Sequence, residues 1–336
     1  MPNPVLIELT RGPLVESVHT GALAIARSNG ELVVSIGDVK RPVFPRSAVK
    51  AFQCMPMIET GAADRFEFGD REIALCCASH SGTEAHATLA ASMLARAKLD
   101  QSALGCGAHE PMQEAAARAL AASGAKASAL HNNCSGKHAG MCACAVHNKE
   151  DPAGYWHPDH PVQQRIVKVL REFTGEELGA DVRGIDGCSA PNWAIPAASL
   201  ARAFAAFITA EGPGKAHRSA AERITKAVWA APGMVAGPGR LDTVVMEKVP
   251  GRVFMKTGAE GVYCGAIPHL GLGFTVKIDD GAKRASEAVT MALLNRLVPE
   301  TKGIGDPSKF KNCSGIEVGE TRISADLARA LDSIAA

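Results

Sequence analysis

The sequence has almost no net charge and no long apolar run. Its 36 Lys and Arg residues oppose 35 Asp and Glu residues, and the basic side chains are scattered, which excludes a strong electrostatic footprint for nucleic acid or an anionic membrane. No stretch approaches the roughly twenty apolar residues of a membrane span, and the N-terminus lacks the basic and apolar regions of an export signal. We therefore expect a cytoplasmic protein with a small-molecule substrate and no nucleic-acid or membrane partner.

The ten cysteines include no Cys-x-x-Cys pair and have no regular spacing. This excludes the framework of a small, disulfide-rich secreted protein. We expect most of them to be reduced and buried, such as Cys76, Cys77, Cys142 and Cys144. With 336 residues, 46% of them hydrophobic, the chain is long enough for one large domain or two closely joined ones.

Strand patterns stand at both ends of the chain and helical patterns stand between them. The expected strands are residues 5–11, 16–25, 32–36, 252–256, 261–266 and 273–278. The expected helices are residues 83–94, 111–122, 160–173, 197–210, 220–230 and 282–297. This order predicts an α+β fold in which both chain ends build one antiparallel sheet.

We divide the chain accordingly. Residues 1–336 form one catalytic domain, with a sheet part at about 1–45 and 240–336 and a helical part at about 46–239. Two loop-like segments, 148–161 and 233–239, are expected to be plain surface connectors rather than lids.

Ser47 and Lys50 stand three residues apart, where a strand-like segment gives way to a helical pattern. If a helix opens at Pro45 or Arg46, the two side chains share one face and the unpaired first-turn N–H groups can face an oxyanion. A serine nucleophile whose proton is taken by a lysine base can catalyse acyl transfer. The ordinary alternative is a helix cap followed by a solvated lysine.

The same Ser-x-x-Lys spacing occurs at two other places, so spacing alone is a weak signal. Ser123/Lys126 lies in a link of small residues, and Ser308/Lys311 lies in a polar stretch. Only Ser47 precedes a run of residues that can bury a helix face, namely Val49, Phe52 and Met55.

Lys256 ends an expected strand and is followed by Thr257 and Gly258. A second cation near Lys50 would lower the pKa of that lysine, as a base requires, and Gly258 would let a substrate approach the backbone. The alternative is an edge-strand lysine before a turn.

Ser79, His80 and Ser81 lie just before a predicted helix. Either serine can be a simple N-cap. Ser79 can also be the second serine that relays protons in serine–lysine acyl-transfer enzymes, although those enzymes have a Ser-x-Asn element where this chain has Ser-His-Ser.

Cys134 and Cys188 each sit in a glycine-containing segment before a helical pattern, where backbone amides favour a thiolate. Two thiolates and one nitrogen, from His138 or less usually from Lys137, would make a zinc site with an open fourth position. The alternative is a pair of buried structural cysteines. A nucleotide-binding P-loop is excluded here, because the first glycine and the Ser or Thr after the lysine are both missing.

Together these segments resemble the Rhizobium etli type L-asparaginase family, also called the asparaginase II-like family, over nearly the whole chain. The resemblance rests on residues 8–19, 45–53, 79–82, 131–138 and 186–188. It implies a fold similar to serine β-lactamases and glutaminases, a homodimer, and hydrolysis of L-asparagine to L-aspartate and ammonia.

The resemblance also implies site residues. The catalytic pairs are Ser47/Lys50 and Ser79/Lys256, and a Zn²⁺ ion is bound by Cys134, Lys137 and Cys188. We assign substrate positioning to three groups within the matched motifs, which are Arg46, His138 and Asp186.

Two rival functions remain open. A β-lactamase or D,D-peptidase would share the nucleophile and the fold, but its cell-wall substrates lie outside the cytoplasm. A zinc-dependent or redox-responsive binding protein would use Cys134 and Cys188 as sensors, with the serines as helix caps.

Overall fold

The computed structural model describes residues 2–304 and 309–334. They form two compact units, each built from separate stretches of the chain. Unit 1 comprises Met1–Ala48, Ile195–Gly212 and Val244–Ala336, and unit 2 comprises Val49–Ala194 and Pro213–Thr243. The first contains the main sheet and the second is mostly helical, while the assignment of both to one catalytic domain stays a prediction.

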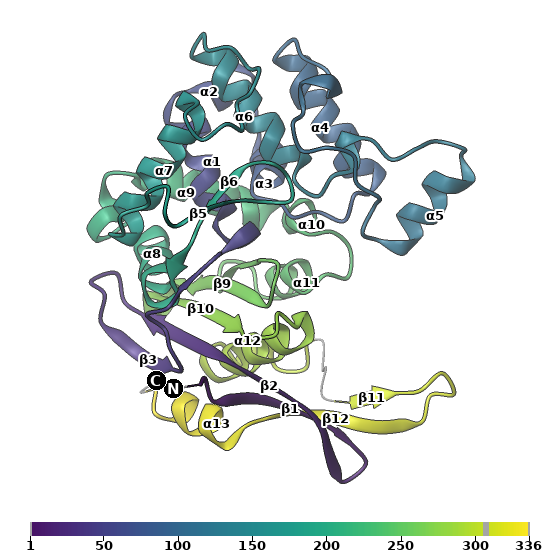
Figure 1. The fold of residues 1–336 in the computed structure, drawn as a ribbon, viewed down its shortest axis with the longest axis vertical. Coiled ribbons are helices and arrows are strands. Elements are labelled where there is room, and N and C mark those ends of the chain that lie inside the picture. Colours follow the sequence, from purple (N-terminus) through teal and green to yellow (C-terminus); the bar gives the residue numbers. More distant parts are fainter. Residues whose placement is uncertain (1, 305–308, 335–336) are drawn as a thin grey trace. The chain divides into compact units, whose positions relative to one another are not determined.

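Unit 1 is organised around an antiparallel sheet to which both chain ends contribute (Figure 1). The strand order is β11-β12-β1-β2-β10-β9-β8, and β3 also pairs with β2. The strands are β1 (Val5–Arg11), β2 (Leu14–Ala26), β3 (Leu32–Ile36), β8 (Phe254–Thr257), β9 (Val262–Ile267), β10 (Leu272–Ile278), β11 (Lys309–Lys311) and β12 (Glu317–Ile323). The prediction of a sheet from both ends is confirmed.

The long strand β2 connects the two halves of this sheet. Its first part pairs with β1, and its second part pairs with β10 in the register Ile25↔Phe274. Ala22, Ala24 and Ala26 pack with helix α8 (Ala197–Thr209), and the intervening Leu23 and Ile25 are also fully buried. Alternate strand residues point to opposite faces, so the sheet is covered on both sides.

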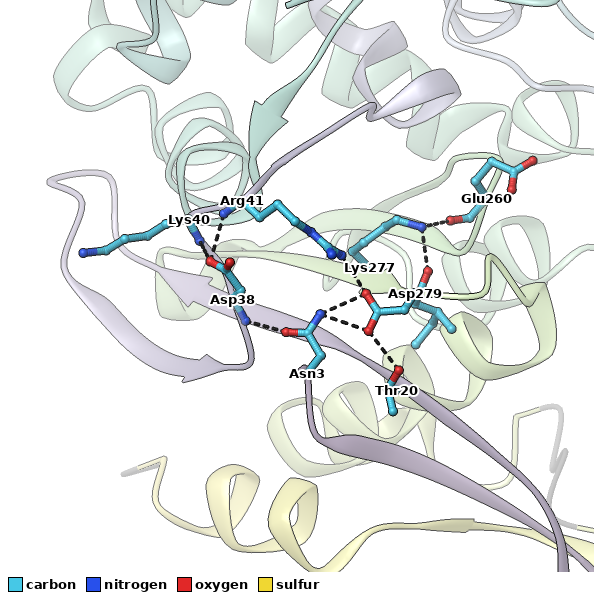
Figure 2. Close-up of polar contacts among 9 residues, drawn as sticks. Asn3, Thr20, Asp38, Lys40, Arg41, Glu260, Lys277 and Asp279 are labelled. Atoms are coloured by element: carbon cyan, nitrogen blue, oxygen red, sulfur yellow. Dashed lines mark hydrogen bonds and ion pairs between the residues drawn. The ribbon is translucent and has the colours of Figure 1, made fainter. Parts of the chain in front are cut away.

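A polar network fastens the N-terminal segment to the end of β10 (Figure 2). Asp279 accepts hydrogen bonds from the side chains of Asn3, Thr20 and Arg41. The side-chain oxygen Oδ1 of Asn3 accepts a hydrogen bond of 2.6 Å from the backbone N–H of Asp38. These contacts stabilise the junction of the two chain ends. The unit also contains α12 (Lys283–Leu297), α13 (Ala325–Asp332) and the small pair β4 (Pro42–Val43) and β7 (Ile195–Pro196).

Unit 2 is built around α6 (Ser135–His147), whose residues 135–145 are all buried. The helix contacts α1, α3, α4 and α7. The helices of this unit are α1 (Lys50–Glu59), α2 (Ala62–Arg65), α3 (Asp70–Cys76), α4 (Glu84–Arg96), α5 (Glu114–Ala122), α6, α7 (Pro161–Thr174), α9 (Arg218–Ala230) and α10 (Pro232–Val235). Strands β5 (Arg183–Ile185) and β6 (Pro191–Trp193) form a short hairpin, and α11 (Leu241–Lys248) spans the boundary between the units.

Gly136 and Gly140 let the backbone of α6 lie closer to α3 than a residue with a Cβ atom would allow. A Cβ added at Gly136 would lie 2.5 Å from the Leu75 carbonyl oxygen, and one at Gly140 would lie 2.6 Å from the Cys76 sulfur. Such separations are far below ordinary van der Waals contact. The first turn of α6 is therefore held tightly against α3.

Two sequence expectations about connectors are wrong. In segment 148–161, Tyr155 is completely buried, and in segment 233–239, Val235 and Ala236 are buried. Their backbone or side-chain groups bond to interior polar groups, as described below, so neither segment is a plain surface loop. The expectation for the cysteines is confirmed, since all ten are free and all but Cys313 are buried.

No helix within residues 2–304 and 309–334 is both long and apolar enough to span a membrane.

Candidate functional site

Ser47 and Lys50 lie where a 3₁₀ turn passes into an α-helix. The turn η1 comprises Arg46–Val49, and Lys50 is the first residue of α1. A helical turn thus opens at Arg46, but it is a 3₁₀ turn that begins with a left-handed Arg46 (φ of 52°), and the α-helix starts only at Lys50. Val49, Phe52 and Met55 are buried as predicted.

Lys50 is buried within unit 2 and its ammonium group meets three acceptors. Nζ donates to the Ala78 carbonyl oxygen, to the Cys134 sulfur at 3.0 Å and weakly to the Asn133 carbonyl oxygen at 3.4 Å. Ala78 immediately precedes Ser79. Lys50 thus joins two segments that the sequence could not place together, the Ser79 loop and the Cys134 segment.

Cys134, Lys137 and Cys188 come together at the N-terminus of α6. Cys134 is the N-cap of this helix and Lys137 lies in its first turn. Cys188 lies in the β5–β6 turn, and its sulfur accepts a hydrogen bond of 3.2 Å from Lys137 Nζ. All three side chains are buried.

A hydrogen-bonding contact between the two sulfurs shifts their pKa values in opposite directions. It lowers the pKa of Cys188, and the positive charge of Lys137 adds to that effect, while the Cys134 thiol donates to the Asn133 side-chain oxygen at 3.1 Å. The contact between the sulfurs, followed by burial, raises the pKa of Cys134. Burial alone would lower the pKa of Lys137, but the neighbouring Cys188 and Cys134 raise it. The cluster is therefore a thiolate, a thiol and an ammonium group.

This donor set fits zinc directly at Cys188, and at Cys134 and Lys137 after each has lost a proton. Thiolates are preferred zinc ligands, whereas Lys137 donates a hydrogen bond here and must release a proton before its nitrogen can coordinate. Across the described parts of the chain, no three His, Cys, Asp or Glu side chains form a metal-binding group. His138 consequently does not complete a site with the two cysteines, and Lys137 is the nitrogen beside them.

His138 lies next to Lys137 in α6 and is fully buried. Burial, followed by the positive charge of Lys137, lowers the pKa of His138 well below its usual value, so the ring is neutral. Its Nδ1 lies 2.5 Å from the Tyr155 hydroxyl, whereas its buried Nε2 has no hydrogen-bond partner among the described residues. Tyr155 was not foreseen, because its only sequence signal is an aromatic residue in a polar segment.

Ser79 lies in the buried segment between α3 and α4, which α10 and the Cys134 segment hold in place. The Ser79 N–H donates to the Val235 carbonyl oxygen at 2.9 Å, and the Ser81 hydroxyl donates to the Ala236 carbonyl oxygen at 2.8 Å. The Ser-His-Ser segment is therefore built into the interior of unit 2, and its serines are not exposed helix caps.

His80 and Ser135 form a second contact that the sequence did not indicate. His80 Nε2 lies 2.9 Å from Ser135 Oγ, and the Gly82 N–H donates to His80 Nδ1 at 3.1 Å. Because Nδ1 accepts, the proton of the neutral ring is on Nε2 and points to the serine. His80 therefore positions Ser135 and cannot take its proton.

The remaining candidates lie in different units. Lys256, in β8 of unit 1, is buried and donates to the Thr257 carbonyl oxygen at 2.8 Å. Asp186, in the β5–β6 turn, accepts from Gly187 N at 2.6 Å and from Asn192 Nδ2 at 2.9 Å. Arg46 and Lys256 belong to unit 1, whereas Ser79 and Asp186 belong to unit 2, so the pairing of Ser79 with Lys256 stays a prediction.

Of the two competing Ser-x-x-Lys matches, Ser123 is exposed and Ser308 lies outside the described residues.

Comparison with known proteins identifies the family. No curated protein matches this chain. A family model described as L-asparaginase II matches residues 7–323, a range that includes every candidate site residue. The chain belongs to the L-asparaginase II family.

Proposed function

We propose that this protein hydrolyses L-asparagine to L-aspartate and ammonia as an enzyme of the Rhizobium etli type. The observation that carries the proposal is the family match over residues 7–323, whose description names an amide hydrolase for this substrate. The burial of Lys50 beside Cys134, and of Lys137 beside Cys188, supports it, because buried cations and thiols gathered at one helix terminus are typical of a functional site.

In the proposed mechanism, Ser47 attacks the side-chain amide carbon of asparagine. Lys50 takes the serine proton, for which it must first be a neutral amine, and backbone N–H groups of the η1 turn stabilise the oxyanion. The C–N bond breaks as the leaving ammonia is protonated through Ser79, with Lys256 orienting that serine. Water then hydrolyses the β-aspartyl ester on Ser47 and regenerates the serine.

Cys134, Lys137 and Cys188 would hold a Zn²⁺ ion. When bound, the ion supplies a positive charge that orients the substrate. The substrate also carries a carboxylate and an ammonium group, and Arg46 and Asp186 have the complementary charges. His138 would donate one hydrogen bond to the substrate and so help to orient it.

The wider proposal includes a fold like that of serine β-lactamases and glutaminases, a homodimer and a cytoplasmic location. The β-lactamase or D,D-peptidase alternative shares the serine and the lysine, and hydrolysis of nitrocefin would favour it. The binding-protein alternative keeps the two cysteines but has no turnover.

The test is ammonia release from asparagine and from glutamine, with and without a zinc chelator, beside a nitrocefin assay. We expect release from asparagine and a rise in KM on chelation, since the ion would orient the substrate. Glutamine differs by one methylene and is expected to be slower by about ten- to two-hundred-fold. Nitrocefin hydrolysis without ammonia release would overturn the proposal in favour of the β-lactamase alternative, and neither activity would favour the binding protein.

A further inference from the structure

Gly105, Tyr155 and His138 of unit 2 are linked by a series of hydrogen bonds that ends on His138. The Gly105 N–H donates to the Tyr155 hydroxyl oxygen at 3.0 Å, and that oxygen lies 2.5 Å from His138 Nδ1. Tyr155 and His138 are both fully buried, and their rings meet edge to face with centroids 5.4 Å apart.

The donor and acceptor roles in this series of hydrogen bonds are fixed, because its first group, the Gly105 N–H, can only donate. A backbone N–H supplies a proton to the tyrosine oxygen, so the hydroxyl proton remains available for another acceptor. Burial raises the pKa of Tyr155, so the hydroxyl keeps that proton. The Cys142 thiol also contacts the hydroxyl, but a thiol sulfur is a much weaker acceptor than an imidazole nitrogen. The proton therefore goes to Nδ1.

A ring nitrogen that accepts a hydrogen bond carries no proton, so the ring proton is on Nε2. That nitrogen is buried and has no partner among the described residues. Buried donors without partners are rare in folded proteins and point to a ligand or an ordered water. His138 follows Lys137 in the first turns of α6, whose N-cap is Cys134, which places this donor in the neighbourhood of the proposed site.

We propose that Tyr155 is a positioning residue, which fixes His138 in the Nε2–H tautomer so that His138 offers a donor, and not an acceptor, to an anionic oxygen of the substrate. This inference rests on the proposed function for the identity of the ligand. The tautomer itself does not depend on it.

The first test is a two-bond ¹⁵N–¹H correlation spectrum of protein labelled at histidine. The eleven histidines are separated by the loss of the His138 signals in His138→Gln. We expect an unprotonated Nδ1 and a protonated Nε2 in the wild type, and a tautomer mixture in Tyr155→Phe. The only other tyrosine, Tyr263, is equally buried in unit 1, and Tyr263→Phe should leave the His138 signals unchanged. A protonated Nδ1 in the wild type would overturn the inference, and this outcome requires only His138→Gln to fold, for the assignment of the signals.

The second test is a double-mutant cycle on the KM for asparagine. Tyr155→Phe should raise KM by about tenfold with a smaller change in kcat, as expected for loss of a charge-assisted hydrogen bond in substrate binding. In a His138→Gln background the same substitution should have almost no further effect, because Tyr155 acts through His138. An equal effect of Tyr155→Phe in both backgrounds would assign tyrosine a purely structural role.

The two tests also separate failure of the inference from failure of the proposed function. An enzyme that releases ammonia but has a protonated Nδ1 contradicts the inference alone. A protein with the expected tautomer but no ammonia release contradicts the proposed function and the choice of ligand.

Discussion

Lys50 is the buried residue on which the proposed chemistry depends most. Replacing it in Lys50→Met keeps the length of the side chain but removes the amine, and kcat for asparagine should fall by about 10²- to 10⁴-fold, the usual contribution of a general base. Lys126→Met, at the exposed lysine of a competing Ser-x-x-Lys match, is the matched control and should be fully active. A Lys50→Met enzyme that folds and keeps kcat within about threefold of the control would exclude this lysine as the base.

Cys134 and Cys188 are coupled, because the contact between their sulfurs raises the pKa of Cys134 and lowers the pKa of Cys188. Recognition of these two cysteines as partners needed only the composition of their segments and the family resemblance. The contact of Lys50 with Cys134 needed the structure, since 84 residues separate them.

The first turn of α6 carries Cys134 and Lys137, and its position depends on close packing against α3. In Gly136→Ala the new Cβ meets the Leu75 backbone, which cannot move aside as a side chain could, so we expect the free energy of unfolding to fall by about 1–3 kcal/mol. Gly233→Ala adds a methyl group with no atom within 4 Å, and it should change stability by less than about 0.5 kcal/mol. Equal urea midpoints for the two variants would show that α6 is not packed in this way.

His217 joins three helices of unit 2 at their ends. Lying just before α9, it contacts Glu59 of α1 at 2.5 Å through Nδ1 and Glu172 of α7 at 2.8 Å through Nε2. The hydrogen bond to Glu59 is the main reason that the pKa of His217 is raised. The stabilisation is therefore complete below the unfolded-state pKa of about 6.5 and is lost as pH rises through the higher folded-state value.

The corresponding measurement compares urea unfolding of the wild type and His217→Gln at two pH values. At about pH 6 the wild type should be more stable by about 1 kcal/mol, a modest figure because the glutamates are partly exposed to solvent. At about pH 9 the difference should shrink. A difference that grows with pH would contradict the ion-pair assignment.

Strong patterns predicted about half of the helices and strands that the structure describes, whereas α3, β12 and α13, for example, were not predicted. The strand patterns in 5–11 and 273–278 match β1 and β10 within a residue. The start of α1 could not be predicted, because the left-handed backbone of Arg46 and the 3₁₀ turn depend on tertiary contacts rather than on the helix propensity of the residues. Segments 148–161 and 233–239 differ from the expectation for the same reason. Their loop-like composition does not show the buried Tyr155 or the backbone carbonyls that accept hydrogen bonds from Ser79 and Ser81.

At the scale of the whole molecule, the order of strand and helix patterns along the sequence predicts a sheet built from both chain ends. It does not predict the register in which the strands pair. The pairing of β2 with β1, β3 and β10 is set by interior packing and by junctions such as the Asn3–Asp279 network. The site is similarly an outcome of the fold. Lys50, Cys134, Lys137 and Cys188 were identifiable by residue type, but their contacts around the first turn of α6 join segments that lie fifty residues or more apart.

The central claim is that Ser47 is the nucleophile of an asparagine amide hydrolase. The most direct test measures ammonia release from asparagine by Ser47→Ala and by Ser123→Ala, the matched substitution at an exposed Ser-x-x-Lys serine. Our account predicts that Ser123→Ala equals the wild type and that Ser47→Ala loses at least about 10³-fold in kcat while binding asparagine and remaining folded. Near-normal turnover by Ser47→Ala would contradict it.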